Sequence, residues 1–417
     1  MTDLSRRELL AGAAALVGGA VLAGLPESVE GQAAAKAAAP ARPVAPPDPT
    51  KLQGGPTSAV GSRSPFFTPA RTPTGETVGN SLTPLQGLSG TITPSDVHFE
   101  RHHAGVPTID PLRHELVIHG LVDRPMVFTM EDIERFPPVT RTYFIECSGN
   151  GRNAYRDPKP DMTPQKAGGL TANTEWTGVT LAQLFREVGV KPEAEWFLAE
   201  GGDACLMTRS VPVAKGWDDA MLVYGQNGEP LRPEQGYPLR LLLPGYEGNM
   251  SVKWLRRIEL GTAPWMTRWE TSKYTDPLPN GTARAWSFDM DAMSLITAPA
   301  TPRKLSGQGW WPISGLAWSG RGKITRVEVS TDGGRRWEDA ELVAPVLSKA
   351  HTRFTRMWEW NGREAILLSR ATDETGYVQP TRAALLEVRG KGTDFHFNHI
   401  RGWRVAPDGQ IFFHGET

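Results

Sequence analysis

The feature that most restricts the fold is a change in hydrophobic patterning at residues 277–281, which read Pro-Leu-Pro-Asn-Gly. Before it, β-rich runs mix with short stretches of helical spacing, without the regular alternation of a doubly wound sheet. After it, apolar and polar residues alternate and helical spacing disappears. The segments that carry these signals are predicted helices at 129–135 and 180–188 and predicted strands at 113–120, 141–147, 196–199, 238–243, 323–331, 335–343, 365–371 and 383–388. We therefore expect a mixed α+β domain followed by an immunoglobulin-like β-sandwich.

The composition limits the function as well as the fold. With 44 Gly and 35 Pro in 417 residues, the chain has too many turn formers for a helical bundle. The net charge of −1 gives no indication of nucleic-acid binding. Two cysteines are too few for a disulfide framework, a Cys-rich zinc site or a Cys-ligated iron–sulfur cluster. Because the sequence contains no C-x-x-C-H, it also excludes covalent c-type haem.

The N-terminus has the pattern of an export signal. Arg6 and Arg7 precede a short, Gly-diluted apolar run that reaches about Leu25, and small residues suitable for cleavage follow. The paired arginines indicate the twin-arginine type, which exports folded proteins. We therefore expect residues 1–32 to be removed, residues 33–95 to form an extended arm, and the mature protein to be periplasmic. No later segment approaches the length of a membrane span, so none is predicted.

Cys147 ends a β-rich run and begins a polar turn, a position where a reactive side chain is held rigidly yet stays accessible. Four interpretations fit it. Residues 149–154 match the G-x-G-x-x-A of a dinucleotide site, although prolines follow where that motif needs a helix. Cys147 is otherwise a thiol nucleophile with a His base, or one ligand of a metal that an organic cofactor already holds. The fourth interpretation is a disulfide with Cys205 in an oxidising compartment.

Four motifs in fixed order go further than any single residue. They are Phe99–His103 (FERHH), Glu146–Arg152 (ECSGNGR), Gln235–Arg240 (QGYPLR) and Ser251–Leu255 (SVKWL). Together they resemble the motifs of the sulfite oxidase family of molybdenum enzymes, and the resemblance spans about residues 96–390. Within that family, segments 116–120, 237–254 and 373–380 are most similar to the SoxC branch. The SoxC branch comprises the molybdenum subunits of sulfane dehydrogenases.

The resemblance implies a domain order and a set of site residues. The implied order is a molybdopterin-binding catalytic domain at 96–283, a β-sandwich dimerisation domain at 284–395 and a C-terminal tail at 396–417. Cys147 matches the cysteine whose thiolate binds molybdenum, Arg101 an arginine that attracts an anionic sulfur substrate, and Tyr274 the active-site tyrosine. The positions that match contacts with the pterin and its phosphate are Phe99, Arg101, His102, His103, Cys147, Asp203, Gln235, Arg240, Ser251, Val252 and Lys253.

The residue types suit these implied roles. Arg and Lys donors bind phosphate, and Arg does so through two parallel hydrogen bonds. Two positions depart from the vertebrate members of the family: His102 stands where they have Asn, and Gln235 where they have His. Because Gln235 replaces a titratable donor with a neutral amide, we expect cofactor contact there to persist. His102 lies beside Arg101 and therefore bears on substrate identity.

The resemblance also implies a reaction and partners. We expect a molybdenum oxidoreductase that oxidises sulfane sulfur on a carrier protein (SoxYZ-like) and passes electrons to a c-type cytochrome subunit (SoxD-like). The expected assembly is a homodimer core within a heterotetramer, with no haem in this chain. The alternative on the same fold is a sulfite dehydrogenase that oxidises free sulfite, and the alternative of a different class is a non-catalytic β-sandwich binding protein. With Cys147 as a metal ligand, a disulfide to Cys205 is not expected.

Overall fold

The structure is a computed structural model that describes Asp48 and residues 52–416. The predicted export signal, residues 1–32, and the beginning of the predicted arm lie outside the described residues. The chain divides into two compact units, residues 1–68 and residues 69–417, and every element named below belongs to the second unit. Among the described residues, no helix has the length and apolar character that a membrane crossing requires.

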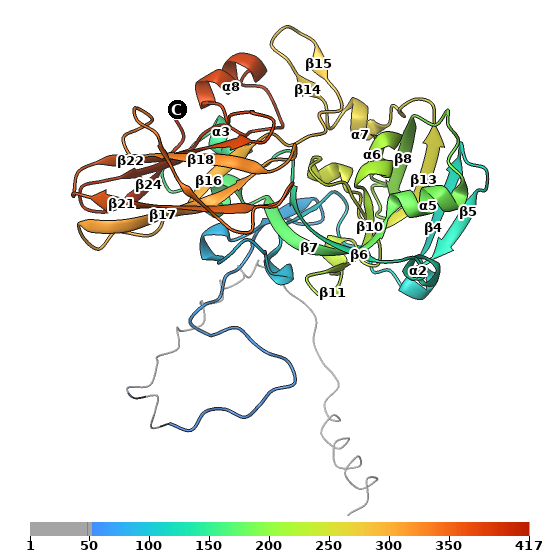
Figure 1. Cartoon of the computed structure of the whole chain (residues 1–417), viewed down its shortest axis with the longest axis horizontal. Coiled ribbons are helices and arrows are strands. Elements are labelled where there is room, and N and C mark those ends of the chain that lie inside the picture. The colour runs from blue at the N-terminus through green and yellow to red at the C-terminus, as the bar shows by residue number, and fades with distance from the viewer. Residues whose placement is uncertain (1–47, 49–51, 417) are drawn as a thin grey trace, which may run out of the picture. The chain divides into compact units, whose positions relative to one another are not determined.

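Two five-stranded sheets make up the first half of the second unit, coloured cyan to yellow in Figure 1. One has the strand order β5-β4-β13-β8-β9, and the other has the order β11-β10-β7-β6, with β12 also pairing with β10. The strands are β4 (Glu115–Gly120), β5 (Met126–Thr129), β6 (Val139–Glu146), β7 (Thr171–Thr180), β8 (Trp196–Gly201), β9 (Thr208–Pro212), β10 (Met221–Gln226), β11 (Glu229–Pro230), β12 (Arg240–Leu242) and β13 (Leu255–Gly261).

Short helices connect these strands, and both helices predicted in this region are confirmed. In α2 (Met130–Glu134) the Thr129 side chain and Asp132 form a reciprocal capping box. The helix α5 (Leu181–Val188) ends at Gly189, which has a φ of 68° that suits glycine. Its apolar side joins one core with both sheets. The other helices are α3 (Arg152–Arg156), α4 (Pro164–Gly168), α6 (Val213–Asp218) and α7 (Arg268–Thr271), and the 3-10 turns are η2 (Leu85–Gly87), η3 (Ser95–Val97), η4 (Pro111–Arg113), η5 (Pro233–Gln235) and η6 (Gly248–Met250).

Part of the predicted arm is a folded element of the site. The strands β1 (Thr72–Gly75), β2 (Gly79–Leu82) and β3 (Glu100–His102) form a three-stranded antiparallel sheet. Its register places Asn80 opposite Arg101. The sequence suggested irregular chain here, because a four-residue polar strand carries little hydrophobic periodicity. The hairpin therefore holds the first site motif in place.

The second half is a β-sandwich, as predicted, coloured orange to red in Figure 1. One sheet has the order β16-β17-β21-β20 and the other β19-β18-β22-β23-β24. Apolar side chains of both sheets share one core, as the twin-sheet architecture requires. The strands are β16 (Met293–Ala298), β17 (Gly309–Trp318), β18 (Ile324–Ser330), β19 (Glu338–Asp339), β20 (Glu341–Val343), β21 (Thr352–Trp360), β22 (Ala365–Asp373), β23 (Gly402–Val405) and β24 (Ile411–His414), and a separate ribbon joins β14 (Asp276–Pro277) to β15 (Ala283–Arg284).

Three predictions for this half need correction. Residues 383–388 are helical, within α8 (Arg382–Arg389), because Thr381 caps the helix and Leu385 packs against Tyr155. A short apolar run cannot by itself distinguish a strand from a helix. The predicted tail, 396–417, supplies β23 and β24, whose pairing with β22 extends a sandwich sheet. The return strand predicted at 335–343 is split, since β19 pairs with β18 but β20 pairs with β21 of the other sheet.

Buried polar contacts connect the sandwich to the strand that ends at Cys147. The Trp318 indole N–H donates to Glu146 Oε2 at 2.7 Å, and Asn150 Nδ2 donates to Glu146 Oε1 at 2.8 Å. The backbone N–H of Phe144 donates to the carbonyl of Lys349 at 3.0 Å. The end of β6 is therefore fixed from both halves of the unit.

Candidate functional site

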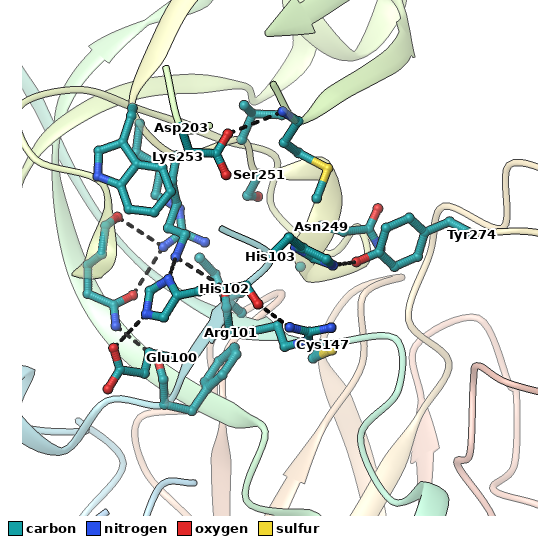
Figure 2. A pocket seen from close by; sticks show the side chains of 18 residues that line it. Glu100, Arg101, His102, His103, Cys147, Asp203, Asn249, Ser251, Lys253 and Tyr274 are labelled. Carbon is teal, nitrogen blue, oxygen red and sulfur yellow. Dashed lines mark hydrogen bonds and ion pairs between the residues drawn. The ribbon is translucent and has the colours of Figure 1, made fainter. Parts of the chain in front are cut away.

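One cavity gathers all the residues that the sequence predicted for the site. The space in the cavity and at its open mouth together measures about 650 Å³, and Figure 2 shows its side chains. The predicted residues that line it are Phe99, Arg101, His102, His103, Cys147, Asp203, Gln235, Arg240, Ser251, Val252, Lys253 and Tyr274. Further lining residues, which the sequence did not single out for the site, are Glu100, Ile145, Met207, Gly248, Asn249 and Trp254. Segments more than a hundred residues apart thus converge on one space.

Cys147 lies directly after β6, where the sheet stops and a tight turn begins. Its N–H donates to Leu170 O at 2.9 Å and its carbonyl accepts from Asn150 N–H at 2.8 Å, so both backbone groups are fixed. The turn continues through Gly151, which has a left-handed φ of 83°. Burial raises the pKa of the Cys147 thiol, although the Gly149 N–H and Arg101 act in the opposite direction. A metal that binds here therefore displaces a proton from this sulfur.

Arg240, the first residue of β12, is a buried cation in the cavity wall. Its Nη1 donates to the Gln235 carbonyl and to Gln235 Oε1, both at 3.2 Å, and its Cζ lies 5.5 Å from the centre of the Trp176 ring. Among the described residues, Arg240 Nε has no hydrogen-bond partner. Burial lowers the pKa of Arg240 to about 9. A buried guanidinium with an unused donor at a cavity wall is suited to bind an anion.

Lys253 lies in the same wall and forms hydrogen bonds with three residues. Its Nζ donates to Arg101 O at 3.1 Å, to Glu234 O at 3.0 Å and to His102 Nδ1 at 2.9 Å. With Nδ1 accepting, His102 Nε2 carries the proton and donates to Glu100 Oε2 at 2.6 Å. Burial lowers the pKa of Lys253 and of His102. His102, one of the departures from the vertebrate pattern, therefore links a lysine to a carboxylate inside the cavity wall.

The other predicted contacts are held by their own hydrogen bonds. The amide of Gln235 donates to Phe99 O at 2.9 Å and its oxygen accepts from Arg240, so Gln235 connects two walls. Ser251 Oγ accepts from the Leu243 N–H at 3.0 Å. These side chains fix the shape of the cavity.

Asp203 follows β8, and its carboxylate is buried beside the second cysteine. Its Oδ2 accepts from the Cys205 thiol at 2.8 Å, and Oδ1 accepts from the Met207 N–H at 3.2 Å. Burial, together with the Asp203 carboxylate, raises the pKa of Cys205 to about 12. Both cysteines are free, so the disulfide interpretation of Cys147 is wrong.

Tyr274 follows α7 and reaches the cavity from the side opposite Lys253 (Figure 2). Its Oη lies 3.0 Å from His103 Nε2, and the two side chains share a hydrogen bond. Burial lowers the pKa of His103 to about 3 and raises that of Tyr274. Both groups are therefore neutral near pH 7, which makes Tyr274 a polar but uncharged neighbour of Cys147.

A second, open cavity meets the first at Arg101, Cys147 and Tyr274. Its charged lining residues, among those the structure describes, are all cationic: Arg101, Arg152 and Lys166. The sequence did not assign Arg152 or Lys166 to the site. Arg152 is the last residue of the second motif, so the sequence offered a reason to assign it to the site. Lys166 lies in a segment without any motif, so the sequence offered no such reason.

The dinucleotide interpretation fails for a reason other than the expected one. A helix, α3, does follow residues 149–151, but it has only five residues. The Arg401 guanidinium packs directly against Gly151. The fingerprint requires a longer helix that starts at the glycines and directs its N-terminus at the pyrophosphate, and this five-residue helix does not supply one.

Comparisons with known proteins agree with this geometry. Residues 103–269 match the family described as "Oxidoreductase molybdopterin binding domain", and residues 284–401 match "Mo-co oxidoreductase dimerisation domain". The crystal structure of the sulfane dehydrogenase SoxCD from Paracoccus pantotrophus contains a similar chain, 44% identical, with a TM-score of 0.85; the match covers 89% of this chain and 99% of that one. This chain belongs to the sulfite oxidase family of molybdenum enzymes. It is a molybdopterin-dependent oxidoreductase.

Curated relatives in this family have different names and lengths. The NADH nitrate reductase of Ulva prolifera is 29% identical over 363 residues, a match that covers 77% of this chain and 42% of the relative. The mitochondrial sulfite oxidase of Mus musculus is 28% identical over 326 residues, covering 72% of this chain and 60% of the relative. The chain thus spans less than two thirds of these relatives.

The cavity fits the molybdopterin cofactor of this family by its chemistry. One thiol, at Cys147, shares the space with two cations, the buried Arg240 and the half-buried Lys253. A single thiolate suits a metal that a pterin ligand already chelates, and the unused donor of Arg240 suits the phosphate. Within the described part of the chain, no three His, Cys, Asp or Glu side chains are grouped as a metal site.

Proposed function

We propose that this oxidoreductase oxidises sulfane sulfur held on a carrier protein and passes the electrons to a c-type cytochrome subunit. The observation that carries the proposal is the 44% identity with a chain of the sulfane dehydrogenase SoxCD, over 99% of that chain. We further propose a SoxD-like cytochrome, a SoxYZ-like carrier and a homodimer core within a heterotetramer. We also propose that residues 1–32 direct export to the periplasm. We further propose that this chain itself holds no haem.

The proposed division of labour follows the two halves. Residues 96–283 hold the cofactor and residues 284–395 mediate dimerisation. When bound, the molybdenum cofactor supplies two-electron oxidation coupled to transfer of oxygen from water. In this proposal Cys147 binds the metal, while Arg240 and Lys253, with the remaining lining residues of the first cavity, hold the pterin and its phosphate.

The substrate reaches Cys147 through the second cavity in this proposal. Arg101, Arg152 and Lys166 give that cavity a positive lining, which attracts an anionic sulfur group and stabilises negative charge as it develops. Tyr274 lies at the junction as an uncharged hydrogen-bonding group.

The second candidate is oxidation of free sulfite. The similarity to mitochondrial sulfite oxidase favours it, and the same three cations suit a small sulfur oxyanion. The two candidates differ in whether the sulfur must be carried to the site by a protein.

The deciding experiment compares two sulfur donors. Purified protein containing molybdenum is mixed with oxidised c-type cytochrome and either a persulfidated carrier protein or free sulfite, and cytochrome reduction is followed optically. We expect rapid reduction with the persulfidated carrier and little with sulfite. Efficient turnover of free sulfite, with none from the carrier, would replace the sulfane proposal with the sulfite one. Cys147→Ser protein serves as the control for reduction that bypasses the site.

A further inference from the structure

A buried charged cluster lies behind Tyr274 and outside both cavities. Arg209, the second residue of β9, is fully buried, and Glu247 and Glu270 are buried as well. Arg209 Nη2 lies 3.4 Å from Glu247 Oε1, and Arg209 Nε lies 3.4 Å from Glu270 Oε1. Glu247 also lies 3.5 Å from His396, which comes from the second half of the unit. The cluster therefore joins β9, α7 and the C-terminal segment.

The guanidinium of this cluster faces the tyrosine of the site. Arg209 Cζ lies 4.9 Å from the centre of the Tyr274 ring, within the range of a cation–π contact. Phe395 packs on the same tyrosine at a centroid distance of 5.2 Å, and His103 holds its hydroxyl at 3.0 Å. Tyr274 is thus fixed at the ring by one set of contacts and at the hydroxyl by another.

The hydrogen bonds of Arg209 are poor for a residue with only a stabilising role. Both ion-pair contacts to carboxylates are long, and neither Arg209 Nε nor Arg209 Nη1 has a hydrogen-bond partner among the described residues. A buried ion pair of this quality contributes little net stability, because apolar side chains of similar volume commonly serve as well. The contact that distinguishes Arg209 from such a replacement is the one with the Tyr274 ring.

We propose that Arg209, held by Glu247 and Glu270, is a positioning residue that fixes the Tyr274 ring so that its hydroxyl stays at the junction of the two cavities. This inference rests on the proposed function, in which Tyr274 adjoins the substrate. Arg209 touches neither cavity, so it acts only through Tyr274.

The first test observes the tyrosine directly and needs no turnover. Full-length protein containing molybdenum is labelled with 3-fluorotyrosine, and the fluorine resonance that disappears in Tyr274→Phe is assigned to Tyr274. Arg209→Met should broaden or split that resonance, because the ring samples more than one orientation, while the other tyrosine resonances stay unchanged. An unaltered, single Tyr274 resonance in Arg209→Met would overturn the proposal.

The matched control is Arg389→Met. Arg389 is another buried arginine in an ion pair, 3.2 Å from Asp276, and none of its contacts is with Tyr274 among the described residues. It should lower stability without changing the Tyr274 resonance. Should Arg209→Met fail to fold, Arg209→Gln, which keeps a donor for the carboxylates but loses the cation, takes its place with the same expected result.

The second test is a kinetic cycle with the sulfur donor that the wild-type protein oxidises. If the whole energy of a desolvated cation–π contact is lost from the transition state, its removal lowers kcat by about 30-fold. We expect Arg209→Met to lower kcat by about that factor in the wild type, but less than about twofold in the Tyr274→Phe background. An equal loss in both backgrounds would mean that Arg209 does not act through the tyrosine hydroxyl. If Tyr274→Phe alone leaves kcat unchanged, the role of Tyr274 in the proposed function fails instead.

Discussion

Replacement of Arg240 by methionine should raise the thermal stability of the cofactor-free protein. The same replacement should lower the affinity of the protein for the cofactor. Arg240 is 4% exposed and lies in the wall of the first cavity. Two hydrogen bonds to Gln235 and a cation–π contact with Trp176 are its only protein contacts of those kinds among the described residues. Methionine fills a similar volume without bringing a charge into the core.

The size of the effect follows from burial. Burial lowers the pKa of Arg240 from its ordinary value to about 9, which corresponds to about 5 kcal/mol of unfavourable desolvation. The two hydrogen bonds and the cation–π contact return about 1 kcal/mol each, which leaves a net cost of about 2 kcal/mol. Because the folded pKa is the lowered one, this cost is fully present below pH 9 and fades only as the pH rises above it.

The assay uses protein produced with and without the cofactor. At pH 7 the cofactor-free Arg240→Met variant should melt about 3 °C higher than the cofactor-free wild type, given about 2 kcal/mol and an unfolding entropy scaled to this length. The variant produced with cofactor should lose about 10- to 100-fold in cofactor affinity, because a charge-assisted phosphate contact is gone. Molybdenum and pterin per chain after gel filtration measure the second effect.

The refuting result is a cofactor-free variant that melts several degrees lower than the wild type. It would show that Arg240 stabilises the fold itself and that its main role is not to bind an anion. Arg401→Met provides the matched control, since Arg401 is equally buried but donates to the carbonyls of Ala167, Phe397 and His399. Its loss leaves those oxygens unpaired, so the control should melt lower.

Four further outcomes are expected at the site and at the neighbouring Cys205. Cys147→Ser should lower turnover by more than about 100-fold with an unchanged circular dichroism spectrum, because a hydroxyl is a poor ligand for a soft metal; retained turnover would contradict the metal role. Arg101→Gln should raise KM by about 10- to 100-fold with a smaller change in kcat, whereas loss of molybdenum on purification would show that Arg101 holds the cofactor instead. Cys205, with a pKa of about 12, should react with iodoacetamide at pH 8 at least about 100-fold more slowly than free cysteine, as followed by mass spectrometry. Asp203→Asn should speed that reaction, and labelling at the rate of a free thiol would argue against the burial of this sulfur.

The residues that line the first cavity could be named from the sequence because four motifs occur in a fixed order. None of these residues indicates a binding site when it is taken singly. Arg240 alone reads as an ordinary surface ion-pair residue, and only its place in the third motif indicated a cofactor contact. The structure then places it with Cys147 in one lining. The two capped helices were also predictable, because caps and helical spacing are local signals.

Other features depend on contacts that no local pattern carries. Lys166 lines the second cavity only because α4 packs beside the turn after Cys147, and β2 joins the site only because it pairs with Arg101. The helix α8 was missed although Thr381 and Gly390 bracket it, since its short apolar run satisfied the strand pattern equally well. Local sequence patterns do not predict the conformation of a segment where contacts with residues distant in the chain decide it.

The two cavities differ in how their linings are held. The first cavity is built at strand ends, and its cations are fixed by backbone carbonyls and by Gln235, so it tolerates little change. The second cavity is lined by residues of the arm hairpin, of α4 and of the turn after Cys147, together with Phe395. In the proposed function, substitutions in the second cavity change the charge and shape that the substrate meets while Cys147 stays in place. Nitrate reductases and sulfite oxidases both match this chain at close to 30% identity, although their names indicate different substrates.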